Sequence, residues 1–247
     1  MSITTDLQAL QIEASDAPDI LKTFSRDTSI FERKPATVVY PKNADEVASV
    51  VQYIRRKREE GVTLALAPRA AGTDMTGGPL TDSIALSFIK YMNKVRDIGP
   101  EHVSAEPGIF YRDLEKRTLA ESGALIPSYP ASRELCALGG MIGNNSGGEL
   151  TLRYGKTSRY VESLDVVLSD GSKVLLKPLS QTELAQKEAL QTLEGSIYRG
   201  AHDLILNNQT LINESRPTVS KNSAGYALWD VWDEALGMFD LTKLIVG

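Results

Sequence analysis

The chain has 247 residues, of which 42% are hydrophobic and 24% charged, and its formal net charge of −5 is modest. These values are typical of a globular protein with a substantial core, and they exclude disordered, collagen-like and repeat classes and disfavour a nucleic-acid partner. A single cysteine, Cys136, excludes an internal disulfide, and the first residues lack the features of a secretory signal. No stretch approaches the roughly 18 apolar residues of a transmembrane segment. We therefore expect a cytoplasmic protein whose membrane contact, if any, is peripheral.

The first half of the chain is predicted to alternate short strands and helices. Residues 1–33 form a polar N-terminal segment with a short amphipathic patch, and regular structure is expected to begin after them. Asn43 can cap a helix that carries apolar residues at helical spacing and ends at Gly61. Apolar runs bounded by turn residues predict strands at 34–41, 63–68 and 83–88.

The second half is predicted to begin with a strand within 102–108 and a helix over 110–123, followed by a long irregular stretch at 125–158. Two alternating runs in 160–178 predict a β-hairpin of the primed-turn kind around Asp170–Gly171. A helix interrupted near Gly195 is expected over 180–213, a loop and a short amphipathic helix over 221–240, and an apolar strand in the last six residues. Because the chain stops directly after that apolar run, we expect it to be a fragment of a longer protein.

Two glycine-rich segments, PRAAGTDMTGG at 68–78 and LGGMIGNNSGG at 138–148, are the candidates for ligand binding. Glycine permits positive φ and a close approach of ligand to backbone, and consecutive backbone N–H groups in such loops form concave anion sites. Two loops of this kind, each beside an apolar strand, predict a ligand that bears phosphate.

Familiar local motifs do not identify this ligand. Gly155-Lys156-Thr157 resembles the end of a P-loop, but Leu150 stands where that motif requires a glycine, and neither loop has the Rossmann G-x-G-x-x-G spacing. Two isolated histidines and one cysteine form no metal-ligand cluster, and the nucleophile elbow of serine hydrolases is missing. These patterns leave a phosphate-binding protein of unspecified type, with no metal expected.

Four motifs in a fixed order carry a more specific resemblance. The stretches FSRDTSIFERKPATVVYPKNADEVASVVQYIRR, PRAAGTDMTGG, LGGMIGNNSGGELTLRYGKTSRYVESLDVVLSDG and KNSAGYAL resemble the FAD-binding domain of the vanillyl-alcohol oxidase or PCMH-type flavoproteins, in particular the branch of D-lactate, glycolate and D-2-hydroxyglutarate dehydrogenases. The resemblance implies an α+β fold of two α/β subdomains, about 34–105 and 106–247, with FAD between them. It also implies that the C-terminal cap domain of the family is absent from this chain.

The resemblance assigns FAD contacts residue by residue to both glycine loops and to a segment that approaches the flavin ring. Ala70 and Ala71 stand where the family usually has glycines, which would strain them if those positions needed positive φ. Thr73 stands where some members carry a histidine that tethers the flavin, so non-covalent FAD is expected. The implied cofactor contacts are Pro68, Arg69, Ala70, Ala71, Gly72, Thr73, Asp74, Pro130, Ser132, Leu138, Gly139, Gly140, Gly143, Asn144, Asn145, Ser146, Gly147, Tyr154, Gly155, Thr157 and Ile245.

The implied activity is oxidation of a D-2-hydroxy acid of the lactate, glycolate or 2-hydroxyglutarate type, by hydride transfer from Cα to flavin N5. The electron acceptor would be a quinone, a cytochrome or an iron–sulfur module. Lys221, Asn222 and Tyr226 are the candidates for the edge of the flavin site, and the catalytic base and substrate-binding residues are expected beyond Gly247. Two alternatives keep the same fold: a sugar-alcohol or aldonolactone oxidase, and an inactive FAD-binding module without its substrate cap.

Overall fold

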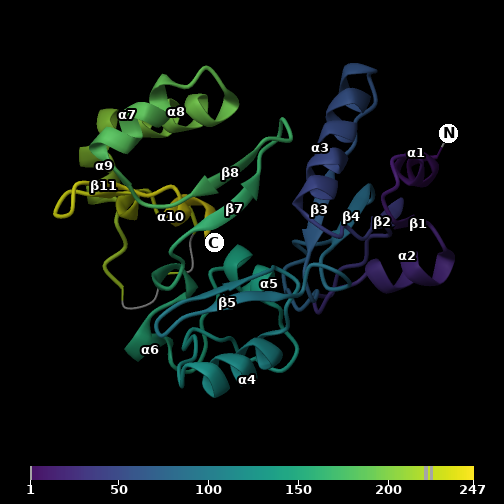
Figure 1. The fold of residues 1–247 in the computed structure, drawn as a ribbon, viewed down its shortest axis with the longest axis horizontal. Coiled ribbons are helices and arrows are strands. Elements are labelled where there is room, and N and C mark those ends of the chain that lie inside the picture. The colour runs from purple at the N-terminus through teal and green to yellow at the C-terminus, as the bar shows by residue number, and fades with distance from the viewer. Residues whose placement is uncertain (1, 220–221, 223–224) are drawn as a thin grey trace.

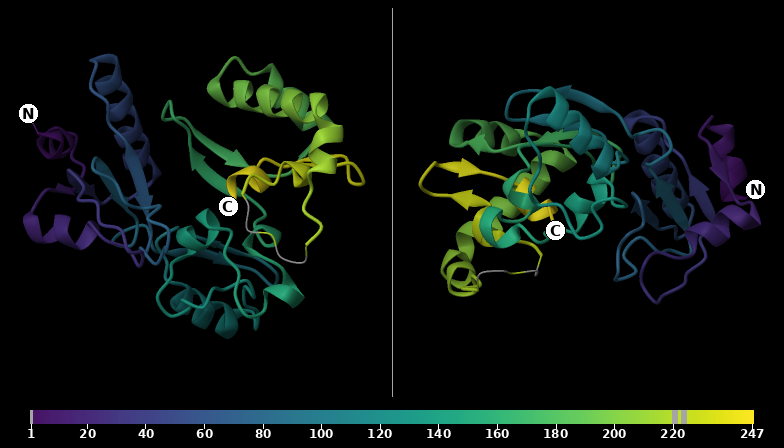
Figure 2. Two further views of the ribbon diagram at one scale, coloured as in Figure 1. Left: turned by 180° about the vertical axis from the view of Figure 1, so that it is seen from behind. Right: turned by 90° about the horizontal axis from the view of Figure 1, so that it is seen from below.

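The computed structural model describes residues 2–219, 222 and 225–247, which form a mixed helix and strand fold. Figure 1 shows its three parts: the N-terminal part up to β4, in purple and blue, the middle part in teal, and the C-terminal part in green and yellow. The middle part lies below the other two in Figure 1 and between them in the right view of Figure 2.

The N-terminal part is built on a four-stranded sheet in the order β1-β2-β4-β3. Strands β2, β4 and β3 are parallel, and β1 pairs antiparallel with β2. Helices on the sheet bury both of its faces, which is why β2 and β4 are continuously apolar or small rather than alternating. The elements are α1 Ile3–Ala9, β1 Ala14–Ser15, α2 Pro18–Phe24, β2 Thr37–Val39, α3 Ala44–Glu59, β3 Leu66–Arg69 and β4 Ile84–Ser87.

Helix α3 confirms the expected sequence signals, whereas the start of ordered structure differs from the prediction. The side chain of Asn43 accepts a hydrogen bond from the N–H of Glu46 at 3.0 Å, and Gly61 follows the helix with φ +83°. The N-terminal segment is not irregular, however, because α1 and α2 pack on the first sheet and β1 extends it. Two-residue strands such as β1 have no local pattern that a sequence could reveal.

The middle part carries an antiparallel pair, β5 with β6, and the helix α4. Strand β5 was not predicted. The stretch 125–158, expected to be irregular, contains two short helices and a 3₁₀ turn, and α5 begins the second glycine-rich segment. The elements are β5 Val95–Ile98, β6 Val103–Ala105, α4 Tyr111–Glu121, α5 Leu138–Gly143, α6 Thr151–Tyr154 and η1 Thr157–Arg159.

The predicted hairpin is present as β7 Leu164–Val167 and β8 Lys173–Leu176, but its turn is not of the primed kind. A primed type I′ turn needs positive φ at both central residues, and only Gly171, at φ +85°, has it. The N–H of Gly171 donates to the carbonyl of Leu168 at 2.9 Å, as in a type I turn followed by a glycine bulge. The carboxylate of Asp170 instead accepts from the N–H of Ser172 at 2.9 Å.

The C-terminal part packs helices against the small sheet β10-β11-β9. The helix expected over 180–213 is present in three pieces, and it breaks just before Gly195. The prediction of an amphipathic helix within 221–240 is wrong, because the described residues there form η2 and a hairpin. The prediction of an apolar strand in the last six residues is also wrong, because a helix forms there. The elements are β9 Leu179–Ser180, α7 Gln181–Ala189, α8 Leu193–Asn207, α9 Gln209–Glu214, η2 Leu228–Asp230, β10 Trp232–Asp233, β11 Met238–Phe239 and α10 Thr242–Ile245.

The C-terminal part also reaches back to the first sheet. The tip of the β7–β8 hairpin lies beside α3 (Figure 1), where Lys173 forms an ion pair with Asp45 and Gln52 packs on Gly171. In the described part of the chain, no helix is both long and apolar enough to cross a membrane.

Candidate cofactor-binding site

The first glycine-rich loop follows Pro68 and Arg69 at the carboxyl end of β3. The backbone N–H groups of Ala70, Ala71, Gly72 and Thr73 donate to no other residue in the described part of the chain. Four successive N–H groups without a protein acceptor are the arrangement that binds anions in phosphate-binding loops. This loop therefore has the donors that a diphosphate needs.

The backbone of this loop resolves the question about its two alanines. Of the residues from Arg69 to Asp74, only Gly72 has a positive φ, of +72°. Ala70 and Ala71 therefore carry no backbone strain, and the glycines usual in the family are not needed there for their conformation. Glycine is required at position 72 for two reasons: its φ is positive, and a Cβ there would lie 2.4 Å from Nη2 of Arg69.

Asp74 closes the loop. One of its carboxylate oxygens accepts from the Thr76 hydroxyl at 2.7 Å, the Gly78 N–H at 2.8 Å and the Thr76 N–H at 3.1 Å. Burial raises the pKa of Asp74, but these hydrogen bonds outweigh burial, so that its pKa is lowered. Asp74 is thus a carboxylate that fixes the end of the loop by accepting hydrogen bonds from Thr76 and Gly78 in the following turn.

The second glycine-rich segment is a helical turn rather than an open loop. In α5, Leu138 donates to the carbonyl of Ile109 and Gly139 to that of Pro107, and Gly140, Met141, Asn144, Asn145 and Ser146 donate to carbonyls within 137–142. These N–H groups are therefore used inside the protein. Gly139 allows α5 to pack closely on Pro107, because a Cβ on it would lie 2.8 Å from that residue. A Cβ on Gly143 would instead point into open space.

The two glycine-rich segments face each other at one point. A Cβ built on Gly140 would lie 3.8 Å from the Cβ of Ala70, which is ordinary van der Waals contact. Because both residues are small and Gly140 has no side chain, the two backbones come close at the place where the resemblance sets the diphosphate.

A third segment, 128–132, meets the end of the second loop. A Cβ on Gly148 would lie 2.3 Å from the carbonyl oxygen of Tyr129 and 3.3 Å from Cα of Pro130. The hydroxyls of Ser128 and Thr157, both buried, are 3.1 Å apart. The expected cofactor residues Pro130 and Ser132 thus lie on a segment that is fixed against the second loop at Gly148.

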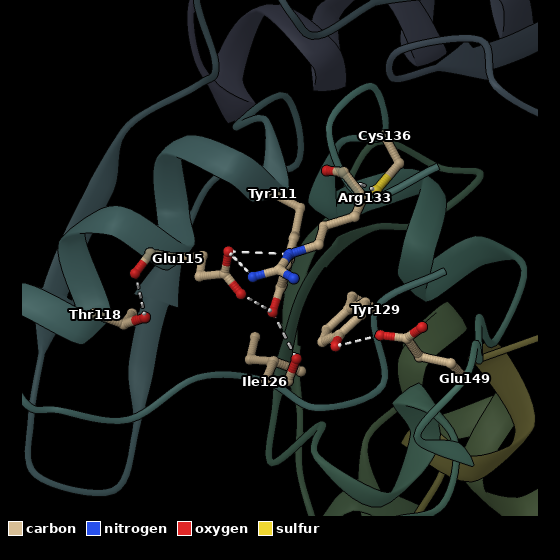
Figure 3. Close-up of polar contacts among 8 residues, drawn as sticks. All are labelled: Tyr111, Glu115, Thr118, Ile126, Tyr129, Arg133, Cys136 and Glu149. Atoms are coloured by element: carbon tan, nitrogen blue, oxygen red, sulfur yellow. Dashed lines mark hydrogen bonds and ion pairs between the residues drawn. The ribbon is translucent and has the colours of Figure 1, made fainter. Parts of the chain in front are cut away.

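Figure 3 shows how α4 holds this third segment. Arg133 binds Oε2 of the buried Glu115 through Nη2 at 2.5 Å and Nε at 3.1 Å, and its guanidinium lies 4.5 Å from the ring centre of Tyr129. The hydroxyl of Tyr129 donates to Glu149 at 3.0 Å, and that of Tyr111 donates to Glu115 at 3.2 Å. The hydrogen bond to Glu115 raises the pKa of Arg133, so the guanidinium keeps its charge. No sequence motif predicts this network of polar contacts.

The chain following the second loop continues the same wall. Ser146 accepts hydrogen bonds from the N–H and the hydroxyl of Thr157, at 3.0 and 2.8 Å. Gly155 has φ +84°, and the carbonyl of Tyr154 accepts from the hydroxyl of Tyr160 at 2.6 Å. Gly147 packs on Thr151, whose buried hydroxyl has no hydrogen-bond partner in the described structure.

The C-terminal residues meet the second loop at Asn145, which has φ +41° and binds the Ser158 N–H at 2.9 Å. Gly247 packs on Asn145 and on Gly225. Lys156 donates to the carbonyl of Asn222 at 2.6 Å.

The remaining expected site residues on this side have different placements. Asn222 lies beside the second loop through its contact with Lys156. Tyr226, with φ +56°, has an exposed side chain, and Ile245 in α10 is half-exposed. Lys221 lies outside the described residues.

The site therefore fits a dinucleotide. Its free N–H groups lie at Ala70–Thr73, and Gly140, which has no side chain, lies opposite Ala70. A concave run of N–H donors suits phosphate oxygens, and small residues allow close approach of a flat ring system.

Comparison with known proteins agrees with this reading. A family model for a FAD binding domain matches residues 35–176. The chain is 30% identical to D-2-hydroxyglutarate dehydrogenase of Escherichia coli (strain K12) over 228 residues, covering 91% of this chain and 22% of that protein. It is 33% identical to glycolate oxidase subunit GlcD of Bacillus subtilis (strain 168) over 148 residues, covering 58% of this chain and 30% of that protein. The chain thus spans less than a third of the length of these relatives.

The expected fold is confirmed by a solved structure of glucooligosaccharide oxidase from Acremonium strictum, whose FAD is 6-S-cysteinyl and 8α-N1-histidyl. The TM-score is 0.60 at 17% identity, and the match covers 76% of this chain and 38% of that one. The fold class is therefore the α+β, PCMH-type FAD-binding fold. By its family match, the chain belongs to the FAD binding domain family.

Proposed function

We propose that FAD binds between the two glycine-rich segments, with its diphosphate on the N–H groups of Ala70–Thr73. The observation that carries this proposal is that these four donors have no acceptor among the described residues, while Gly140 of α5 lies opposite Ala70. Gly140 and its neighbours would line the opposite wall, and Pro130 and Ser132 would lie toward the flavin ring. The other residues expected to contact FAD, from Pro68 to Ile245, remain part of the proposal, as does the division of the chain near residue 105.

The bound FAD is proposed to be non-covalent. Thr73 stands where a tethering histidine would stand in some members of the family. The two histidines of the chain are engaged elsewhere: His102 contacts Asp97 at 2.9 Å, and His202 contacts Glu188 at 2.6 Å. Cys136 is buried beneath the third segment, with its thiol against the carbonyl of Arg133.

We further propose that the whole protein oxidises a D-2-hydroxy acid to the 2-oxo acid. Its relatives at about 30% identity include a D-2-hydroxyglutarate dehydrogenase and a glycolate oxidase subunit, which favours this substrate class over sugars. FAD supplies the two-electron acceptor for such a reaction. The residues of this chain would hold and orient it, and Asn222 and Tyr226 would lie at the edge of the site. The electrons would pass to a quinone, a cytochrome or an iron–sulfur module, and the protein would act in the cytoplasm or peripherally at a membrane.

The test is titration of the purified chain with FAD, followed by flavin fluorescence and by equilibrium dialysis. We expect saturable binding of one FAD per chain, competition by ADP, and release of all flavin on denaturation in acid, because the bond is not covalent. A protein that binds no FAD would contradict the cofactor site. Flavin that stays attached after denaturation would contradict the non-covalent assignment.

The substrate is tested separately on the full-length protein by anaerobic reduction of its flavin. We expect bleaching of the flavin absorbance by D-2-hydroxy acids and none by their L-enantiomers or by oligosaccharides. Bleaching by sugars alone would overturn the proposed substrate class and leave the FAD site intact.

A further inference from the structure

The side chain of Arg69 reaches from the carboxyl end of β3 into the N-terminal segment. It donates to the carbonyl of Arg26 at 2.7 Å and to that of Phe24 at 3.3 Å, and its guanidinium lies 5.0 Å from the centre of the Phe24 ring. Its relative exposure is 9%, and no carboxylate forms an ion pair with it in the described part of the chain. Burial lowers the pKa of Arg69, and the charge of Asp27 opposes that shift. The structure thus holds a buried cation on two carbonyls and an aromatic face.

The same N-terminal residues hold the far end of the loop. We call residues 24–33 the N-terminal brace. Thr28 donates to the carbonyl of Asp74 twice, from its hydroxyl at 2.7 Å and its N–H at 3.1 Å. The ring of Phe31 packs on Gly77, where an added Cβ would lie 3.0 Å from it. The brace therefore contacts the loop on both sides of the four free N–H groups.

The loop needs such support because it does not support itself. Its N–H groups from Ala70 to Thr73 make no hydrogen bond to the described residues, so no internal ladder fixes their direction. The guanidinium of Arg69 lies directly against Gly72, since a Cβ there would be 2.4 Å from Nη2 and 2.8 Å from Cζ. A fixed positive charge thus lies against the loop backbone at Gly72, where the low local dielectric strengthens its effect on an anion bound by the loop.

We propose that Arg69 is a positioning residue for the diphosphate of FAD: clamped by the N-terminal brace, it fixes the Ala70–Thr73 backbone in its anion-binding form and places a buried positive charge against it. This inference rests on the proposed FAD site. It assigns the N-terminal segment, which lies outside the matched family region, a role in cofactor affinity.

The test compares three variants of the intact chain by FAD and ADP affinity and by the melting temperature of the FAD-free protein. Arg69→Gln removes the charge, and Arg69→Lys keeps the charge but loses the paired donors. Thr28→Val removes one exposed hydroxyl from the brace and leaves the fold intact. Arg199→Lys is the matched control, because Arg199 likewise donates to backbone carbonyls, including that of Leu190 at 2.9 Å, but on α8.

We expect Arg69→Gln to weaken FAD and ADP binding at least about tenfold, Arg69→Lys to recover part of that loss, and Thr28→Val to weaken both about threefold, the effect of one ordinary hydrogen bond. Arg199→Lys should lower the melting temperature and leave both affinities unchanged. A purely structural role predicts the opposite for Arg69: a lower melting temperature with unchanged affinities, which would overturn the inference. If Arg69→Gln does not fold, unchanged affinities in Arg69→Lys and Thr28→Val would overturn it equally. Failure of the wild-type chain to bind FAD would instead refute the proposed site itself, and the inference with it.

Discussion

Gly148 offers a test of how closely the third segment packs on the second loop. In Gly148→Ala the new Cβ would meet the carbonyl oxygen of Tyr129 at 2.3 Å, about 1 Å short of ordinary van der Waals contact. The obstacle is backbone, so no side-chain rotation can relieve it, and the two segments must move apart. Forced overpacking of this kind typically costs about 1–3 kcal/mol of unfolding free energy.

The assay is urea unfolding of the FAD-free chain, with two alanine variants in the same glycine run as controls. Gly143→Ala places its Cβ in open space within α5, and we expect it to be neutral or to stabilise by about 0.5–1 kcal/mol, as alanine does in a helix. Gly140→Ala makes an ordinary 3.8 Å contact with Ala70, so it should fold normally but bind FAD more weakly, because it narrows the space between the loops. Equal stability of Gly148→Ala and Gly143→Ala would show that the third segment does not pack on Gly148.

Three further outcomes follow from named side chains. Glu115→Gln leaves the charge of Arg133 without its partner; a buried pair broken in this way costs about 3–5 kcal/mol, and because 38% of the Arg133 side chain is exposed we expect about 1–3 kcal/mol by urea unfolding. Equal unfolding free energies of the wild type and Glu115→Gln would show that the ion pair between Arg133 and Glu115 is not formed. The hydrogen bond from Lys177 lowers the pKa of Glu183 to about 2, so its stabilisation is fully present above its usual pKa of 4.5 and is lost as the pH falls toward 2. The urea midpoints of wild type and Glu183→Gln should therefore differ at pH 6 and converge as the pH falls from 4.5 toward 2, and a difference that stays constant between pH 4.5 and pH 2 would refute the assignment. Asp74→Ala removes three hydrogen bonds that shape the turn after the first loop, and it should weaken FAD binding in dialysis, whereas unchanged affinity would show that the turn is fixed by other contacts.

Elements whose signals are local could be predicted from the sequence. Helix α3 was found because Asn43 caps it and its apolar residues recur at helical spacing, and the pairing of β7 with β8 followed from alternation around Gly171. Elements fixed by distant contacts could not be predicted. The run TKLIVG is too short for its period to distinguish a strand from the helix α10, and β10 and β11 exist only because β9 pairs with β11.

The candidate site shows the same division. Ordered motifs located both loops and the segment at Pro130, because each is a contiguous stretch with unusual residues. They could not show where the side chain of Arg69 points, since its partners are main-chain carbonyls 43 and 45 residues earlier in the chain, and any residue type supplies a carbonyl. Nor could they show that Ala70 and Ala71 are unstrained, because φ depends on the route of the chain after β3.

The two glycine-rich segments look alike in sequence but contribute different chemistry. In α5 most N–H groups are hydrogen-bonded within the protein, so its glycines present a surface without side chains and few free donors. In the first loop the N–H groups are free while three of the four residues Ala70–Thr73 carry side chains, and only Gly72 requires glycine. A bound anion needs hydrogen-bond donors, whereas a flat ring needs a surface without side chains. The first loop therefore supplies donors to the diphosphate, and Gly140 opposite Ala70 leaves space for it, so substitutions in the first loop and at Gly140 should both change ADP and FAD affinity together.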